Sequence, residues 1–236
     1  PEFNKGRVWN FANGTLELDT CVLREPNPDD YLRFQVGYNY DEKAECPVFD
    51  KFLNDVTCGD ETRINFLLDM LGYIFYVDNA LQKLFFLIGE GNNGKSTFIE
   101  MIKDLVYNVH AKKDNQTFTA IEPVELSEDT KAIMLKNSFV NLCYDITTNI
   151  KDTSALKKLA TNDQLSGNLK FYDTESFSTR AKIICSANEM IKVNEDTYAL
   201  RRRLMFCRFA NDFTRNPDTK MNEKLRAELP GIFNKG

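Results

Sequence analysis

An apolar run that leads into a glycine-rich loop constrains the fold of this chain more than any other stretch. Residues 84–88 read LFFLI, which predicts a strand buried on both faces of a parallel sheet. Residues 89–96 then match GxxxxGKS, the pattern of a phosphate-binding loop (P-loop). Apolar side chains follow over residues 98–106 at the spacing of one helix face. Strand, loop and helix in this order predict an α/β fold that binds a nucleoside triphosphate.

The residue types in the loop suit a triphosphate. Glycine lets successive backbone N–H groups turn inward onto phosphate oxygens without a clash at Cβ. We expect Lys95 to reach the β- and γ-phosphates and the Ser96 hydroxyl to ligate Mg²⁺ at the positive end of the helix dipole. The structural alternative is a glycine-rich turn with a chance lysine. We predict ATP and Mg²⁺ as cofactors, with binding residues Gly89, Glu90, Gly91, Asn92, Asn93, Gly94, Lys95, Ser96 and Thr97.

Cysteine and histidine usage limits the other chemistry. The six cysteines form no Cys-x-x-Cys pair, and Cys143, Cys185 and Cys207 lie in apolar runs, which favours core positions over a zinc site. A single histidine, His110, argues against histidine-based catalysis. No signal peptide or membrane span is evident. We expect a cytoplasmic protein, in the host cytoplasm if the source is a phage or virus, and no membrane partner.

The net charge of −5 gives no global basic surface for nucleic acid, so any such contact must be local. We interpret the 236 residues as a fragment of a longer protein. The expected organisation is an N-terminal β region (1–45), a helical subdomain (46–80) and a P-loop core (81–236).

Periodicity and turn signals predict the elements before the loop. Residues 8–18 alternate apolar and polar around Asn13-Gly14, which predicts a hairpin, and residues 31–36 offer another short strand. Helices are expected over residues 47–56 and from a cap at Asp60.

The second half of the chain predicts more of a parallel sheet. Apolar runs at 138–144, 183–187 and 204–209 suit buried strands. We expect a helix over 127–135, another that carries Leu156 and Leu159, and irregular structure at 110–125.

Polar residues follow two of these runs. Asp145 ends the first, where a carboxylate can hold Mg²⁺ or orient the attacking water, because ligands sit outside the carboxyl ends of parallel strands. Asn188 and Glu189 end the second, and an asparagine amide there can position water. The alternatives are an acid that starts a loop and an asparagine that is only a turn residue.

Arg201, Arg202 and Arg203 precede the last run. Such a run is usually a solvated charge cluster. In a chain with a phosphate loop, a guanidinium from a neighbouring subunit can instead neutralise charge on the γ-phosphate. Read as strand, residues 201 and 203 point one way and residue 202 the other.

Residues 163–177 alternate apolar and polar around a turn, which predicts a hairpin with Lys170 and Tyr172 on one face near its tip. Residues 151–182 hold six Lys/Arg against four Asp/Glu. A lysine beside an aromatic suits backbone contact and base stacking on single-stranded DNA. The alternative is a solvated surface hairpin.

These motifs in this order resemble the superfamily 3 helicases, in particular the primase-helicases of phages, plasmids and large DNA viruses of the poxvirus type. The segments that carry the resemblance are GEGNNGKST (89–97), the strand that ends at Asp145, LKKL (156–159), SGNLK (166–170), SANE (186–189), LRRRL (200–204), NFANGTLEL (10–18) and ELPGI (228–232).

The resemblance implies an AAA-like core in a homo-hexameric ring that moves on single-stranded DNA during replication, with a primase domain elsewhere in the longer protein. It implies that Lys95 and Ser96 are the Walker A residues, Asp145 the Walker B acid and Asn188 the sensor. Arg202 or Arg203 becomes the finger in trans, and the Lys170 hairpin the pore loop. Relatives commonly end the Walker B strand with two acids or a glutamate. Here Asp145 stands alone, so it acts by itself or with Glu189.

Two other functions fit the residues. A P-loop ATPase can remodel or load a protein partner without unwinding DNA. A small-molecule kinase would need a lid and an acceptor site but no arginine from a neighbour. Stimulation of ATP hydrolysis by protein concentration and single-stranded DNA separates the helicase from both.

Overall fold

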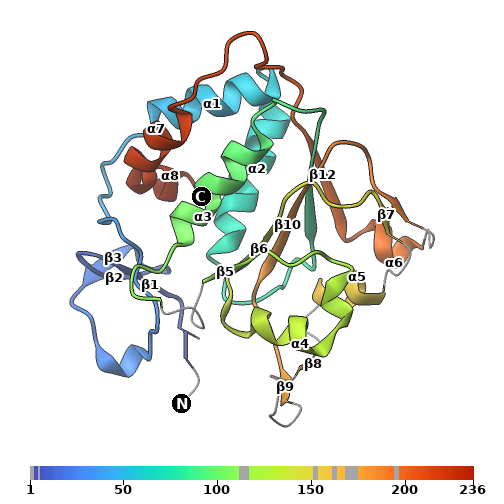
Figure 1. The fold of residues 1–236 in the computed structure, drawn as a ribbon. Helices are drawn as coiled ribbons and strands as arrows, with labels where there is room; N and C mark the ends of the chain where they lie inside the picture. Colours follow the sequence, from blue (N-terminus) through green and yellow to red (C-terminus); the bar gives the residue numbers. More distant parts are fainter. Residues whose placement is uncertain are drawn as a thin grey trace.

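A five-stranded parallel sheet forms the centre of the molecule (Figure 1). The computed structural model describes residues 3–4, 6–111, 117–150, 154–160, 164–167, 175–193 and 197–236. The predicted strand at 84–88 is β4, between two strands that come much later in the chain. The strand order is β12 (Leu204–Arg208), β4 (Leu84–Ile88), β10 (Lys182–Ala187), β6 (Val140–Cys143) and β5 (Phe118–Thr119). The central parallel sheet is therefore confirmed.

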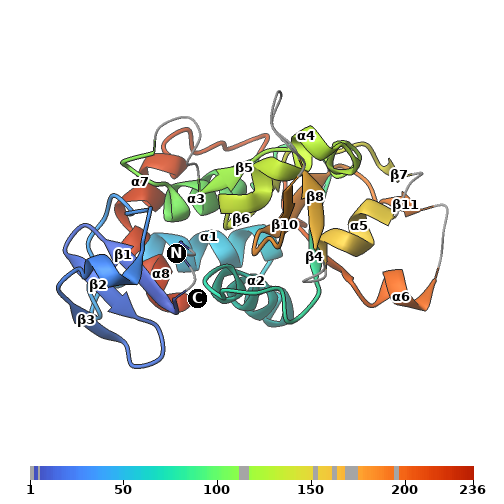
Figure 2. The ribbon, with the colours of Figure 1, turned by 90° about the horizontal axis from the view of Figure 1, so that it is seen from below.

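Alternate side chains of β4 pack into two separate cores, which explains the unbroken apolar run. Phe85 and Leu87 join a core with α1 (Pro47–Thr57), α2 (Glu61–Ile74) and α3 (Lys95–Val106). Leu84 and Phe86 pack on the other face, beside α4 (Asp129–Ala132) and α5 (Ser154–Leu159). The helices thus cover both faces of the sheet (Figure 2).

The predicted helices around the loop are present. α1 and α2 occupy the expected ranges, and the Asp60 carboxylate accepts a hydrogen bond from Arg63 N at 3.2 Å at the start of α2. The apolar face of α3, which is Phe98, Met101, Ile102, Leu105 and Val106, is buried.

A small antiparallel sheet packs against the main core through aromatic rings. It consists of β1 (Val8–Phe11), β2 (Gly14–Glu17) and β3 (Val22–Arg24). The hairpin is present, but its two loop residues are 12 and 13 and not the expected Asn13-Gly14, because Gly14 pairs with Phe11 as the first residue of β2. Gly14 is required because a Cβ there would lie 2.7 Å from the Arg24 carbonyl oxygen. Trp9 contacts Phe34, Phe75 and Phe139 at centroid distances of 4.8–4.9 Å for each pair.

Several sequence predictions differ from the structure. Residues 31–36 form no strand; only Val36 bridges, to Asn108, after the 3₁₀ helix η1 (Pro28–Asp30). The helix expected over 127–135 is the short α4, between the 3₁₀ helices η2 (Glu125–Ser127) and η3 (Ile133–Asn137). The stretch 110–125, expected to be irregular, contains β5.

Short elements complete the second half of the chain. β8 (Leu165–Gly167) pairs antiparallel with β9 (Glu175–Phe177), so the predicted hairpin is present, although Lys170 and Tyr172 lie outside the described residues. β7 (Asn149–Ile150) pairs parallel with β11 (Lys192–Val193). Helix α6 (Tyr198–Arg201) precedes β12.

The C-terminal helices close onto the N-terminal end of α1. They are α7 (Met221–Ala227) and α8 (Leu229–Lys235). The Glu228 carboxylate between them accepts hydrogen bonds from Val48 N at 3.0 Å and Phe49 N at 2.9 Å, and so caps α1 from 180 residues away in sequence. None of the helices in the described part of the chain has the length and apolar character needed to cross a membrane.

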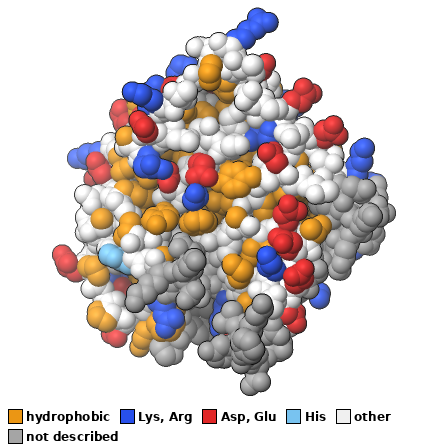
Figure 3. Space-filling view, viewed as in Figure 1, with side chains coloured by type: hydrophobic (Ala, Val, Ile, Leu, Met, Phe, Trp, Pro, Cys, Tyr) orange, Lys and Arg blue, Asp and Glu red, His pale blue; other side chains and the backbone are white. Residues whose placement is uncertain are grey.

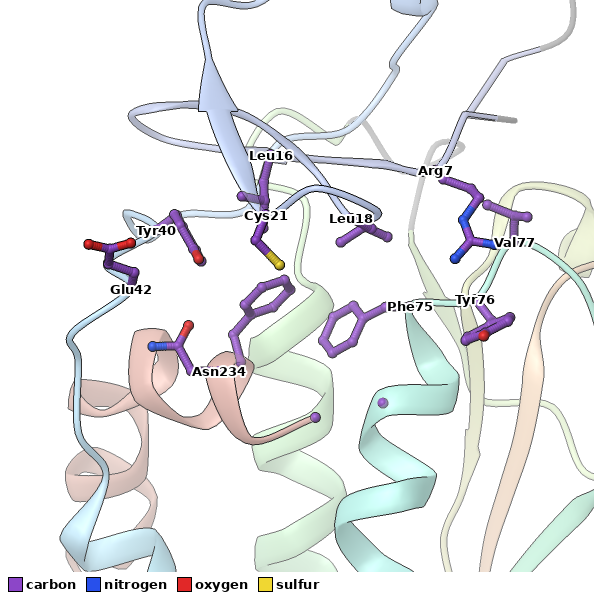
Figure 4. A pocket seen from close by; sticks show the side chains of 13 residues that line it. Arg7, Leu16, Leu18, Cys21, Tyr40, Glu42, Phe75, Tyr76, Val77 and Asn234 are labelled. Atoms are coloured by element: carbon purple, nitrogen blue, oxygen red, sulfur yellow. The ribbon is translucent and has the colours of Figure 1, made fainter.

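A hollow of about 390 Å³ lies between the small sheet, the end of α2 and α8 (Figure 4). Leu16, Leu18, Phe75 and Phe233 give it apolar walls. It is remote from the glycine-rich loop, so we do not include it in the candidate site.

Candidate nucleotide site

The loop after β4 is held in shape by its own side chains. Asn93 Nδ2 donates to the Glu90 carbonyl at 2.5 Å, and Asn93 Oδ1 accepts from Lys95 Nζ at 3.1 Å. Gly89 leaves room for this asparagine, because a Cβ at residue 89 would lie 2.1 Å from Asn93 Nδ2 and 2.6 Å from the Phe209 carbonyl oxygen. Sequence reasoning missed this bracing role of Asn93.

The positions of Gly91 and Gly94 fit a loop that receives a ligand. A Cβ at Gly91 would meet nothing within 4 Å, so that part of the loop faces open space. Gly94 has φ of +91°, a left-handed conformation that favours glycine, and its Cβ would lie 2.8 Å from Val56 Cγ1. Helix α3 begins at the next residue, so its N-terminal dipole is directed at the loop.

Lys95 lies at the centre of the site. Its side chain is buried, and its ammonium donates to the Gly89 carbonyl and contacts Asn188 Oδ1 at 3.5 Å. Burial lowers the pKa of Lys95, and the nearby charge of Asp145 partly opposes that shift. The structure therefore brings together Lys95, Asn188 and the charge of Asp145 at the carboxyl ends of the parallel strands.

Asp145 follows β6 in a strained conformation, with φ of +46°. Its N–H donates to Ser186 Oγ at 3.0 Å, and the next residue, Ile146, donates to the Ser186 carbonyl at 2.9 Å. Ser186 on β10 thus fixes the turn that presents the exposed carboxylate. Sequence reasoning did not single out Ser186, although the SANE segment contains it. Glu189 follows Asn188 after β10 and is exposed.

Ser96 is in the first turn of α3 and is exposed. Mg²⁺ usually takes one or two protein ligands and completes its shell with water and phosphate oxygens. A hydroxyl at Ser96 and a carboxylate at Asp145 are suitable donors for such a site. Within the described residues, no group of three or more His, Cys, Asp or Glu side chains forms a closed metal site.

A second carboxylate lies beside this edge. Tyr144, adjacent to Asp145, donates its hydroxyl to Glu100 Oε1 on α3 at 2.6 Å. Burial and the carboxylate raise the pKa of Tyr144. Lys103 Nζ is 3.0 Å from the other oxygen of Glu100. The contact links the turn after β6 to α3 on one side of the loop.

The arginines lie at the opposite end of the strands and directly precede β12, as predicted, but they do not have the strand conformation that would point residues 201 and 203 one way and residue 202 the other. Arg201 ends α6, and Arg202 and Arg203 form a turn before β12. The Arg203 carbonyl accepts from Leu84 N at 2.8 Å, so these residues lie beside the start of β4. The five residues of β4 span about 16 Å, and the loop lies beyond their far end. The arginines are therefore not part of the site around this chain's own glycine-rich loop.

All six cysteines are free thiols, and Cys143, Cys185 and Cys207 are buried as predicted. Burial raises the pKa of Cys207 to about 11, which keeps this thiol protonated and unreactive near neutral pH. Acidic and basic side chains are interspersed on the face of the molecule shown in Figure 3.

Two family models match the chain: a family of unknown function (DUF5906) over residues 87–203, and "D5 N terminal like" over residues 1–58. The "Putative helicase L207/L206" of Acanthamoeba polyphaga mimivirus is 21% identical over 224 residues, which is 92% of this chain and 23% of that protein. The uncharacterized mitochondrial protein ymf21 of Marchantia polymorpha is 24% identical over 122 residues, 47% of this chain and 68% of that protein.

Among solved structures, the C-terminal region of NrS-1 has the same fold. In one apo form the TM-score is 0.69 at 15% identity, covering 99% of this chain and 52% of that one. A second apo structure gives a TM-score of 0.65 at 15% identity, with 99% and 53% covered. The chain thus spans about half of these structures and about a quarter of the mimivirus relative. Together, these matches confirm the resemblance to primase-helicases of phages and large DNA viruses.

Proposed function

We propose that this chain is the ATPase core of a superfamily 3 type DNA helicase. It hydrolyses ATP with Mg²⁺ at the interfaces of a ring, a homo-hexamer, and moves on single-stranded DNA during replication in the cytoplasm. The main support is the meeting of Lys95, Asn188 and the charge of Asp145 around a glycine-rich loop at the carboxyl edge of a parallel sheet.

Each residue around the loop has a different role in the proposed hydrolysis of ATP. Backbone N–H groups of residues 89–94 and the start of α3 bind and orient the triphosphate. Ser96 and Asp145 would hold Mg²⁺, whose charge neutralises the phosphate oxygens. Asp145, alone or with Glu189, orients the attacking water, and Asn188 lies beside Lys95 where the γ-phosphate is expected. The Lys95 ammonium stabilises charge on the transferred group.

The arginines fit a role toward a neighbouring copy. Because Arg202 and Arg203 lie at the amino edge of the sheet, they cannot serve the loop of their own chain but are free to serve a loop in an adjacent subunit. The Arg203 side chain donates to the Ala199 carbonyl, whereas Arg202 is exposed and contacts Gln82 Oε1 at 3.4 Å. This difference favours Arg202 as the finger.

One set of experiments tests the proposal. ATP hydrolysis per subunit should rise with protein concentration and with added single-stranded DNA. Lys170→Ala should weaken the DNA stimulation and leave nucleotide binding intact, with Lys43→Ala, on an exposed loop, as the matched control. A rate that is indifferent to both concentration and DNA would favour the protein-remodelling or kinase alternatives.

Complementation locates the finger. Lys95→Ala keeps its arginines, and Arg202→Ala keeps its loop, so mixed rings should recover activity that neither variant has alone. Arg203→Ala is tested in the same way. If neither mixture recovers activity, the finger lies outside this arginine run.

A further inference from the structure

A hollow of about 710 Å³ borders the loop on the side away from Asp145. Its walls are α1, the loop and the strap, which we define as residues 210–220 between β12 and α7. The strap arches over α1 (Figure 1). Val48 and Phe52 from α1, Phe213 from the strap and Met221 from α7 supply its apolar surface. The volume is within the usual range of about 300–1,000 Å³ for small-molecule sites.

The position of the hollow along the loop fixes which end of a triphosphate would face it. Asn92, Gly94 and Thr97 line the hollow, whereas the Lys95 ammonium is directed at Asn188 on the other side of the loop. When the γ-phosphate lies at Lys95, the triphosphate extends along the loop, whose backbone N–H groups cradle the α- and β-phosphates beside the hollow. Whatever is attached to the α-phosphate then enters the hollow.

The charged groups on the lining form two ion pairs. Lys51 bonds Asp55 across one turn of α1, and Lys224 Nζ lies 2.5 Å from Asp218 Oδ2. Hydrogen bonds to Lys224 and to Lys220 N lower the pKa of Asp218. The hollow therefore has no unpaired charge in its lining and suits a neutral, flat, partly apolar group better than another phosphate.

The outer wall is tied directly to the loop. Phe213 N donates to the Asn92 carbonyl at 2.8 Å, and Asn92 Nδ2 donates to Thr214 Oγ1 at 3.2 Å. Asp212 in turn accepts from Thr214 N at 2.8 Å. Because these bonds hold the strap against the loop, the Phe213 ring is positioned beside the phosphate path.

From these contacts we propose that the hollow binds the nucleoside part of the triphosphate, with the base packed against Phe213, Val48 and Met221. The proposal rests on the proposed nucleotide-binding function and names the residues that distinguish a nucleotide from bare phosphate. Base-to-aromatic packing accounts for the Phe213 contribution. Because these side chains would contact the faces of the base and not its polar edge, the site should bind different bases with similar affinity.

The test compares ATP with inorganic tripolyphosphate, at matched Mg²⁺, by isothermal titration calorimetry. Phe213→Ala should weaken ATP binding about tenfold and leave tripolyphosphate binding unchanged. Met221→Trp, which fills the hollow from α7, should have the same selective effect without removing any strap contact. The matched control is Phe206→Ala, an exposed phenylalanine on β12 outside the hollow.

The outcomes separate this inference from the function. Equal weakening of both ligands, or wild-type affinity for ATP in both variants, would overturn the base site and leave the helicase proposal standing. No ATP binding by the wild-type chain would overturn both. Selective loss of ATP binding in a chain that never hydrolyses ATP would support the base site and overturn the helicase.

Discussion

Two buried lysines lie at opposite edges of the same sheet, and their surroundings differ. Lys95 is 4% exposed, and an asparagine side chain and a loop carbonyl hold its ammonium beside exposed Asn188. Lys182 is 1% exposed and donates to three main-chain carbonyls, those of Tyr76, Asp78 and Arg180, at 2.7–2.9 Å. The Lys95 ammonium can exchange its side-chain partners for a phosphate, because Asn188 is exposed to solvent. The Lys182 ammonium instead bonds backbone carbonyls and so holds the linker before β4 in place.

The two lysines indicate that residues for function and residues for stability lie at opposite ends of the same strands. At the carboxyl edge, polar groups are exposed or strained, as Asp145 is. At the amino end of the strands, Lys182 is buried, and the guanidinium of half-buried Arg180 packs 3.8 Å from the Phe139 ring centroid. A buried cation with satisfied bonds, as Lys182 is, serves the fold, and exposed polar groups at strand ends are available for chemistry.

The largest effect is expected at the carboxyl edge. Lys95→Ala should reduce ATP hydrolysis about a thousandfold, because an ammonium that stabilises the transferred phosphate is lost. Its free energy of unfolding should fall by no more than about 1 kcal/mol, because the hydrogen bond from Asn93 to the Glu90 carbonyl still holds the loop when the ammonium is removed. Steady-state assays measure the hydrolysis rate, and urea unfolding measures the free energy of unfolding. A collapse of stability would show that Lys95 is a structural lysine like Lys182.

Lys182→Met should have the opposite profile. It removes the buried ammonium that three main-chain carbonyls share, which should lower the free energy of unfolding by about 2–4 kcal/mol. The hydrolysis rate per folded molecule should be unchanged. Urea unfolding, with Lys43→Met as the exposed control, measures the change. If Lys182→Met were as stable as wild type but inactive, Lys182 would have a functional role, and the contrast with Lys95 would be wrong.

The pH dependence of stability sharpens the comparison. Burial, together with the charge of Arg180, lowers the pKa of Lys182 to about 7, against about 10.4 for an unfolded lysine. Between these values the unfolded chain binds more protons, so the free energy of unfolding should rise with pH, by at most about 1.4 kcal/mol per pH unit. Wild type should gain stability over Lys182→Met from pH 7 to pH 9. Parallel stability curves would contradict this account.

The smallest effect is expected at the α1 cap. Glu228→Gln keeps the shape but removes the charge that faces the N-terminus of α1, and should cost about 1 kcal/mol. Thermal unfolding with Glu223→Gln, on exposed α7, as control measures the difference. Because the same change leaves the loop contacts in place, ATP affinity should not move.

Much of the fold could be predicted from the sequence, because short, mainly apolar runs mark β4, β6, β10 and β12. β5 could not, since buried Asn141 fixes its end: Asn141 Oδ1 accepts from Thr119 Oγ1 at 2.8 Å and from Ile121 N at 3.0 Å. A two-residue strand held by one side chain has no periodic signal. The position of the arginine run before β12 was predicted, but its conformation was not, because a charge cluster does not distinguish a helix end from a strand start.

The site was predicted in part. Strand ends placed Asp145 and Asn188 at one edge, because parallel strands share their carboxyl side. The residues that hold the site in shape were not predicted. Ser186, on the neighbouring strand β10, bonds the turn at Asp145, and Asn93 bonds the Glu90 carbonyl in space that Gly89 leaves open. The hollow was not predicted either, because its walls come from residues 48, 92 and 213, which only the folded chain brings together.

The strand order has a consequence for synthesis. Both partners of β4 come later in the chain, and the first of them, β10, begins 94 residues after Ile88. At about 5–20 residues per second, the ribosome needs roughly 5–20 s to supply it. During that time LFFLI is a five-residue apolar segment with no partner strand and no charge to protect it. The segment that later carries the glycine-rich loop is therefore exposed to aggregation until its partner strands have been made.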